Sequence, residues 1–204
     1  METFTTLSAI AAPVMRENVN TDVIIRIERL IELDRGALGP YCFEAWRTLP
    51  DGRPNPDFVL NQARWRGARI LVCGDNFGCG SSREGAVWAL GGMGIRAVIG
   101  TSFGDIFFNN CFQNGLLPVV LPAEAVARLA AEVEASANAA PTTIDLEAQV
   151  VIGPSGQRYP FPIDANRKRA LLQGLDDIGL TLTRESEIAA FQARDRKARP
   201  WVHP

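Results

Sequence analysis

The middle of the chain alternates short apolar runs with stretches of helical character. Residues 69–73 form a continuous apolar run that predicts a buried strand, and residues 97–100 and 117–121 predict two further strands. The intervening residues 84–90 and 106–114 favour helices. A strand, helix, strand, helix, strand order predicts parallel strands joined by right-handed crossovers.

Three other segments carry local signals. The segment VNTDVIIRIERLI, residues 19–31, begins with an apolar run that predicts a strand. Residues 49–58 contain three prolines and a glycine, which predict a long surface loop. Ser102 and Asp105 have the Ser-x-x-Asp spacing of a helix start, so we expect Ser102 to cap the helix that follows.

The C-terminal part of the chain changes pattern near residue 141. Before it, Pro122 is expected at the first position of a helix with one apolar face. After it, TTIDLE, QVVIG and RYPF predict short strands, and two helices are expected, at 164–172 with Asp164 as the cap and at 183–193. We expect residues 1–194 to form one domain and residues 195–204 a loosely held tail.

The overall composition is that of a globular protein, with 47% hydrophobic and 22% charged residues. A net charge of −2 provides no basic field for a phosphate backbone, so general nucleic-acid binding is disfavoured. The opening residues lack the pattern of an export signal, and no apolar stretch reaches membrane-spanning length. We therefore expect a soluble, cytoplasmic protein with its cysteines as free thiols.

The residue inventory excludes several kinds of chemistry. His203 is the one histidine in the sequence, and it lies in the tail, so a Ser-His-Asp relay or a histidine-rich metal site cannot be assembled. Cys73 and Cys79 are six residues apart, and no Cys-x-x-Cys pair of the kind common in iron–sulfur sites occurs. Any metal chemistry would therefore need a metal held by another chain.

The loop GDNFGCGSSRE, residues 74–84, follows the first buried strand of the central pattern and leads into a helix. Gly78, Cys79 and Gly80 can form a backbone anion nest, since the glycines permit positive φ and the helix start favours negative charge. Arg83 adds a planar fork suited to a carboxylate or phosphate. The alternative interpretation is purely structural, because Ser81 and Glu84 have the spacing of a capping box.

Two motif-based interpretations of the same loop fail. Arg83 stands where a dinucleotide-binding fingerprint requires its third glycine, and no Gly-Lys-Ser/Thr occurs in the chain. A serine-hydrolase elbow is excluded because its second glycine is missing and no histidine is within reach. The anion that the loop is suited to hold is therefore a small one.

Taken in order, VNTDVII, PNPDFVL, GDNFGCGSSRE, SFGDIFFNNCFQNGLLPV and GLDDIGLTL resemble the small subunits of 3-isopropylmalate dehydratases. The resemblance extends from about Val19 to Phe191, which is most of the chain. It implies an α/β fold: a swivelling β/β/α domain like the C-terminal domain of aconitase, with C-terminal helices. It also implies a heterodimer with a large subunit that carries a [4Fe-4S] cluster, while this chain binds no metal.

The resemblance further implies roles for individual residues. Ser81 would be the catalytic base, Ser82 and Arg83 would bind the dicarboxylate substrate, and Arg35 would lie near the substrate's side chain. Asp22 would belong to a loop near the cleft. The implied reaction is dehydration of 2-isopropylmalate and rehydration to 3-isopropylmalate in leucine biosynthesis.

The sequence departs from the family pattern at three positions. Gly85 stands where histidine is usual, Arg26 where proline is common and Gly36 where threonine is common. These departures keep two alternatives open. The chain could act on another 2-hydroxy dicarboxylate, of the methylmalate or dimethylmalate type, or it could be a non-catalytic anion-binding module.

Overall fold

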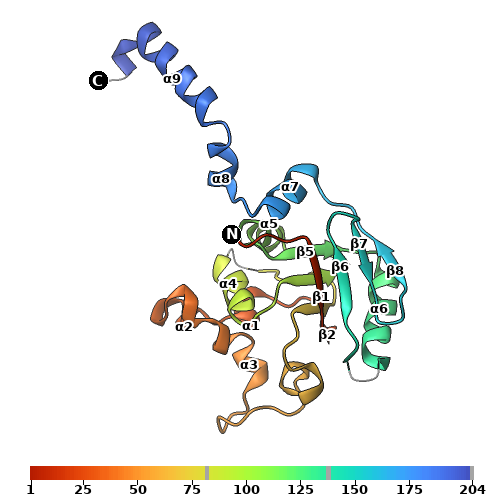
Figure 1. The fold of residues 1–204 in the computed structure, drawn as a ribbon. Coiled ribbons are helices and arrows are strands. Elements are labelled where there is room, and N and C mark those ends of the chain that lie inside the picture. The colour runs from red at the N-terminus through yellow and green to blue at the C-terminus, as the bar shows by residue number, and fades with distance from the viewer. Residues whose placement is uncertain (81–82, 137–138, 203–204) are drawn as a thin grey trace.

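The computed structural model describes residues 1–80, 83–136 and 139–202 and contains two four-stranded sheets (Figure 1). The first sheet is parallel throughout, with strand order β2-β3-β4-β5. Every residue of its central strands β3 and β4 is buried, which explains why their sequences are continuously apolar. The strands are β2 (Ala11–Val14), β3 (Ile70–Cys73), β4 (Ala97–Gly100) and β5 (Leu117–Val120).

The three strands predicted for this sheet are confirmed, and the sequence missed β2. Strand β2 contains Pro13 and lies at the sheet edge beside β3, where a residue without an N–H is tolerated. A proline within four residues also removes the usual signal of a strand.

The predicted helices of the central pattern are confirmed with small shifts at their ends. These are α4 (Glu84–Gly92), α5 (Asp105–Gln113) and α6 (Ala123–Ala135). Pro122 occupies the N-cap of α6 and not its first helical position. The buried residues of α6, which packs on the parallel sheet, are the four that share its apolar face: Val126, Leu129, Ala130 and Val133.

The second sheet is antiparallel, with strand order β1-β6-β7-β8. It contains the three short strands predicted after residue 141 and one that was not predicted, β1, which pairs with β6. Since β1 and β2 are separated by Ile10 alone, the N-terminal run joins the two sheets. The strands are β1 (Thr6–Ala9), β6 (Thr142–Asp145), β7 (Val150–Ile152) and β8 (Arg158–Pro160).

The strand predicted within residues 19–31 is wrong, because this segment forms the helices α1 (Thr21–Ile24) and α2 (Ile27–Glu32). The Asn20 side chain accepts a hydrogen bond from Val23 N at 2.9 Å and so starts α1. Ile24 and Ile25 are then buried side by side at the end of this single turn. Arg26 is extended and separates the two helices.

Short helical turns connect α2 to β3, as expected for a loop-rich segment. Phe58 nevertheless enters the core, so the predicted surface loop 49–58 is anchored at its end. The turns are η1 (Arg35–Ala37), η2 (Gly39–Tyr41), α3 (Glu44–Arg47), η3 (Val59–Asn61) and η4 (Ala63–Trp65).

The C-terminal helices differ from the rest of the chain. Helix α7 (Ala165–Gln173) is capped by Asp164 as predicted. Beyond it, α8 (Asp177–Leu182), α9 (Glu185–Ala198) and η6 (Pro200–Val202) lead away from the two sheets (Figure 1). The single helix predicted at 183–193 is thus too short, and the predicted division after residue 194 falls within α9. In the described part of the chain, no helix is both long and apolar enough to cross a membrane.

Candidate functional site

Residues 74–80 continue β3 beyond the carboxyl edge of the parallel sheet, as the sequence predicted. Segments on both sides hold this loop through backbone hydrogen bonds. Gly78 N donates to Val19 O at 2.7 Å and Thr21 N donates to Cys79 O at 2.9 Å, while Gly104 N donates to Phe77 O at 3.0 Å. The loop is therefore fixed between the start of α1 and the start of α5.

Both glycines of the predicted nest have positive φ, +73° at Gly78 and +88° at Gly80. A Cβ at Gly78 would lie 2.3 Å from the Phe107 ring, so the loop backbone packs directly on the aromatic core. Because the Gly78 amide donates to Val19, an anion at this turn would have to be bound by the amides that follow. A hollow of about 360 Å³ beside the loop is lined by residues 76, 78–80 and 103–107.

Ser102 serves this loop and not the following helix, so the predicted cap is wrong. Gly104 is the N-cap of α5. Ser102 Oγ donates to Asp75 Oδ1 at 2.6 Å and accepts from Asn76 N at 3.0 Å, and Thr101 Oγ1 also donates to Asp75. These hydroxyl donors lower the pKa of Asp75.

The catalytic candidates Ser81 and Ser82 lie outside the described residues. Helix α4 begins at Glu84 with Arg83 as its N-cap residue. Glu84 is therefore the first residue of the helix. The capping-box interpretation requires it to be the third.

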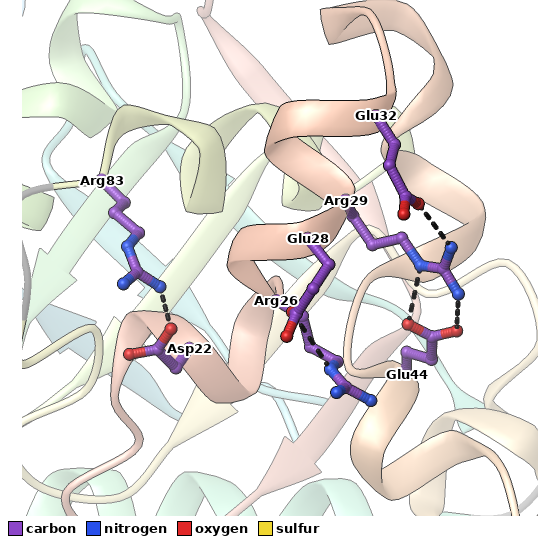
Figure 2. A network of polar contacts seen from close by, with 7 residues as sticks. All are labelled: Asp22, Arg26, Glu28, Arg29, Glu32, Glu44 and Arg83. Atoms are coloured by element: carbon purple, nitrogen blue, oxygen red, sulfur yellow. Dashed lines mark hydrogen bonds and ion pairs between the residues drawn. The ribbon is translucent and has the colours of Figure 1, made fainter.

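Arg83 is paired with Asp22 of α1, as Figure 2 shows. Its Nη1 donates to Asp22 Oδ1, and the Arg83 side chain is 20% exposed. The structure thus brings the segment at Asp22, which the resemblance placed near a cleft, against the arginine at the start of α4. A guanidinium has five N–H donors, so this pairing leaves others available for a carboxylate.

Arg35 of η1 contacts α4 at Trp88 and is connected to the start of that helix through Asn114. Its guanidinium lies 5.0 Å from the centroid of the Trp88 ring, and Nη2 donates to Asn114 Oδ1 at 2.7 Å. Asn114 Nδ2 in turn donates to Glu84 Oε1 at 2.8 Å, next to Arg83. Sequence reasoning missed Asn114, since an Asn-Gly pair at a helix end indicates a C-cap and nothing more.

The space beside Arg35 is a hollow of about 490 Å³. Its lining includes Glu84 and Asn114 together with Asp176, Asp177 and Ile178 at the start of α8. Arg35 therefore lies at the edge of an open space.

Charged side chains also hold α2 in place, as Figure 2 shows. Arg29 binds Glu44 through two donors, Nε at 3.0 Å and Nη2 at 2.7 Å, and binds Glu32 at 3.0 Å through Nη1. Hydrogen bonding from Arg29 lowers the pKa of Glu44. This bidentate pair joins α2 to α3.

The three departures from the family pattern have different surroundings. A Cβ at Gly85 would lie 2.4 Å from Leu30 Cδ2, so Leu30 of α2 occupies the space of any side chain at position 85. Gly36 has no atom within 4 Å of an added Cβ. Arg26 pairs with Glu28 at 3.5 Å on an exposed surface, where an ion pair contributes little.

The described residues contain no group of three or more His, Cys, Asp or Glu side chains placed to hold a metal ion. The cysteines are free, as expected, and burial raises the pKa of the Cys42, Cys73 and Cys111 thiols. His203 lies outside the described residues. A donor set for a metal cluster cannot be built from the part of the chain that the structure describes.

Three family models of known proteins match successive parts of the chain. Residues 1–124 match the family model of the aconitase C-terminal domain, and residues 127–165 match the model described as LeuD_N. Residues 177–204 match the C-terminal domain of 3-isopropylmalate dehydratase small subunits.

Two relatives named 3-isopropylmalate dehydratase small subunit align with nearly the whole chain. The protein from Jannaschia sp. (strain CCS1) is 54% identical over 202 residues, which cover 99% of this chain and 100% of the relative. The protein from Paramagnetospirillum magneticum is 52% identical with the same coverage.

A solved structure supports the fold. The 3-isopropylmalate dehydratase from Methanocaldococcus jannaschii aligns with a TM-score of 0.65 and 24% identity, covering 91% of this chain and 98% of that one. The predicted aconitase-type α/β fold with C-terminal helices is thereby confirmed.

Proposed function

The chain belongs to the family of 3-isopropylmalate dehydratase small subunits, and from this premise we propose that it interconverts 2-isopropylmalate and 3-isopropylmalate together with a large subunit. Dehydration gives isopropylmaleate and rehydration gives the isomer, a step of leucine biosynthesis. The observation that carries the proposal is the position of Arg83. It follows the glycine loop at the start of α4, and its side chain is paired with Asp22 of α1.

In this proposal, Arg83 binds a substrate carboxylate. Asp22 accepts a hydrogen bond from Arg83 Nη1 and so restricts the orientation of the guanidinium. The remaining N–H donors of Arg83 can form a planar pair of hydrogen bonds with the substrate carboxylate. The start of α4 adds a favourable dipole for the same negative charge. Ser82 contributes a further polar contact to the substrate.

Ser81 acts as the base that removes the proton from the carbon next to the hydroxyl-bearing carbon. A serine hydroxyl is a weak base in water, so its ionised form needs hydrogen-bond donors and a nearby cation. The amides of Cys79 and Gly80, the helix start and Arg83 supply groups of this kind. In the rehydration, the hydroxyl is added to the carbon that lost the proton, and the Ser81 hydroxyl returns the proton to the carbon that lost the hydroxyl.

The [4Fe-4S] cluster is assigned to the large subunit, since the described residues of this chain offer no donor set for it. When bound there, such a cluster supplies a Lewis acid for the departing hydroxyl. The small subunit would then be inactive alone, and the heterodimer would work in the cytoplasm.

The test is isomerase activity of the reconstituted complex with the Ser81→Ala variant. Removal of a true base should lower kcat by at least about 10²-fold. Ser8→Ala is the matched control, because Ser8 lies in the antiparallel sheet and its hydroxyl accepts from Thr143 at 2.9 Å. Turnover by Ser81→Ala near the level of Ser8→Ala would refute the assignment.

A second candidate substrate class follows from the Leu30 contact at Gly85. An apolar group replaces a family histidine close to Arg83, which favours a different alkyl substituent on the 2-hydroxy dicarboxylate. Comparing kcat/KM for isopropylmalate, methylmalate and dimethylmalate decides between the substrates, and a clear preference for isopropylmalate dismisses this candidate. Calorimetric binding without turnover of any of them would instead indicate a non-catalytic anion-binding module.

A further inference from the structure

We propose that Asn114 is a positioning residue that holds Arg35 beside the start of α4. The inference rests on the proposed function and on the role that the family resemblance implies for Arg35, close to the substrate's side chain. Asn114 Oδ1 accepts from Arg35 Nη2 at 2.7 Å and from Trp88 Nε1 at 3.1 Å. Its Nδ2 donates to Glu84 Oε1 at 2.8 Å and to the Asn110 carbonyl at 2.9 Å. The side-chain amide thus uses both acceptor sites and both donors.

The chemistry of the four partners fixes the orientation of this amide. Guanidinium and indole groups only donate, whereas a carboxylate and a backbone carbonyl only accept. Rotating the amide by 180° would place donors against donors and acceptors against acceptors. Arg35 and Glu84 therefore require opposite ends of the same planar group.

Arg35 depends on these contacts because its own element gives it little support. None of the described residues of η1, 35–37, is buried, and Gly36 is surrounded by open space. The Trp88 ring lies 5.0 Å from the guanidinium and provides a flat surface, while Asn114 provides the directional bond. Trp88 is itself held by Asn114, so one residue orients both the arginine and the ring it faces.

The functional consequence concerns the distance between two cations. Asn114 connects Arg35 to Glu84, the residue after Arg83, and Arg83 is restrained by Asp22. A dicarboxylate with an alkyl substituent that contacts both regions would therefore meet two groups with fixed spacing. Loss of Asn114 should raise KM and leave kcat nearly unchanged, because Arg35 binds the substrate and does not transfer the proton.

The first test is a double-mutant cycle in the reconstituted complex. Asn114→Leu should lower kcat/KM by about 10- to 100-fold, the range expected for a lost hydrogen bond to a charged group. In an Arg35→Ala background, the same substitution should change kcat/KM by less than about twofold, because nothing remains to be positioned. An equal loss in both backgrounds would overturn the proposal.

A conservative variant separates positioning from folding. Asn114→Asp keeps the acceptor for Arg35 and Trp88 but sets a second carboxylate oxygen against Glu84, so it is combined with Glu84→Gln, whose amide can donate to that oxygen. The pair should bring KM most of the way back from its raised value in Asn114→Leu, whereas a merely structural role predicts that both variants fail alike. Thermal unfolding of each variant identifies any that do not fold.

A second readout is independent of turnover. In the isolated full-length subunit, Arg35→Ala should shift the Trp88 indole N–H resonance, which Trp88→Phe identifies, and the shift should disappear in the Asn114→Leu background. A shift of equal size in both backgrounds contradicts the inference. If the wild-type complex fails to turn over isopropylmalate, the proposed function fails while this spectrum still decides whether Asn114 holds Arg35.

Discussion

The two sheets and the C-terminal helices α8 and α9 use the same apolar residue types with opposite outcomes. Phe77, within the glycine loop that follows β3, is fully buried, and it packs edge-on against Phe107 with ring centroids 5.6 Å apart. On the C-terminal helices, Ile178, Leu182 and Phe191 are 71%, 58% and 55% exposed, and none of the described residues 177–198 is buried. Hydrophobic residues at helical spacing predict a helix, but they do not predict what the helix packs against.

The difference has an energetic meaning. The region around the loop gains stability from burial of apolar area. Helices α8 and α9 bury no residue and are held by polar contacts: the Asp176 cap, the Gln113–Asp177 hydrogen bond to α5 at 3.0 Å and the Arg199–Asp195 pair. Isolated helices shorter than about 12–15 residues are marginal in water. The loop that carries the candidate site therefore rests on the buried apolar core.

The largest effect is expected from Phe77→Ala, which should lower the free energy of unfolding by about 3–5 kcal/mol. The substitution removes a fully buried ring and leaves a cavity between the loop and α5. Urea unfolding followed by circular dichroism measures it. A loss below about 1 kcal/mol, typical of a surface position, would mean that the loop does not rest on a packed core.

A smaller effect is expected from Gly78→Ala compared with Gly52→Ala. Both glycines have positive φ, +73° and +84°, so both variants incur the left-handed backbone penalty of about 1–2 kcal/mol. At Gly78 the added Cβ also meets the Phe107 ring, which should cost a further ~1–3 kcal/mol, whereas at Gly52 it meets no atom within 4 Å. Equal losses for the two variants, measured by the same unfolding curves, would show that the loop yields without strain.

The effect of Asp75 is smaller still and depends on pH. Hydroxyl donors from Ser102 and Thr101 lower its pKa in the folded state, so the carboxylate stabilises the fold above the unfolded pKa, and this contribution is lost as the pH falls through the folded pKa. Asp75→Asn should therefore be less stable than the parent at neutral pH, and the gap should close in acid. Melting temperatures across this range measure the gap, and a gap that is constant with pH would contradict the expectation.

The smallest effect is expected from Phe191→Ala, the counterpart of Phe77→Ala on the C-terminal helices. Because the ring is 55% exposed, the free energy of unfolding of the isolated chain should change by less than about 0.5 kcal/mol. A loss comparable to that of Phe77→Ala would mean that α9 is packed in solution and that the two regions do not differ in the way described.

The sequence predicted those elements whose burial is simple. Strands β3 and β4 lie in the middle of a parallel sheet, so every residue is apolar and the pattern is unambiguous. Strand β2 and helix α1 were missed or misassigned because their signals are local and weak: a proline at a sheet edge, and a single turn set by Asn20. Short elements of this kind are decided by tertiary partners that no window of sequence contains.

In the candidate site, too, the features set by neighbouring residues were predicted, and those set by distant residues were not. The glycine loop and the placement of Arg83 at a helix start follow from neighbouring residues, and the sequence indicated both. The roles of Ser81, Ser82 and Arg35 stay predictions from resemblance. Asn114 was not predicted, because its function depends on groups from η1, α4 and α5 that meet only in the folded chain.

The contact between Leu30 and Gly85 limits how the chain can change over generations. Since a methyl group of Leu30 stands where a Cβ of residue 85 would be, a side chain there requires Leu30 to change its rotamer or to be replaced by a smaller residue. The order of substitutions then matters, because a smaller residue at position 30 makes room for a larger one at position 85. Descendants of this sequence are expected to alter the two positions together, and a mutational library covering both should reveal that dependence.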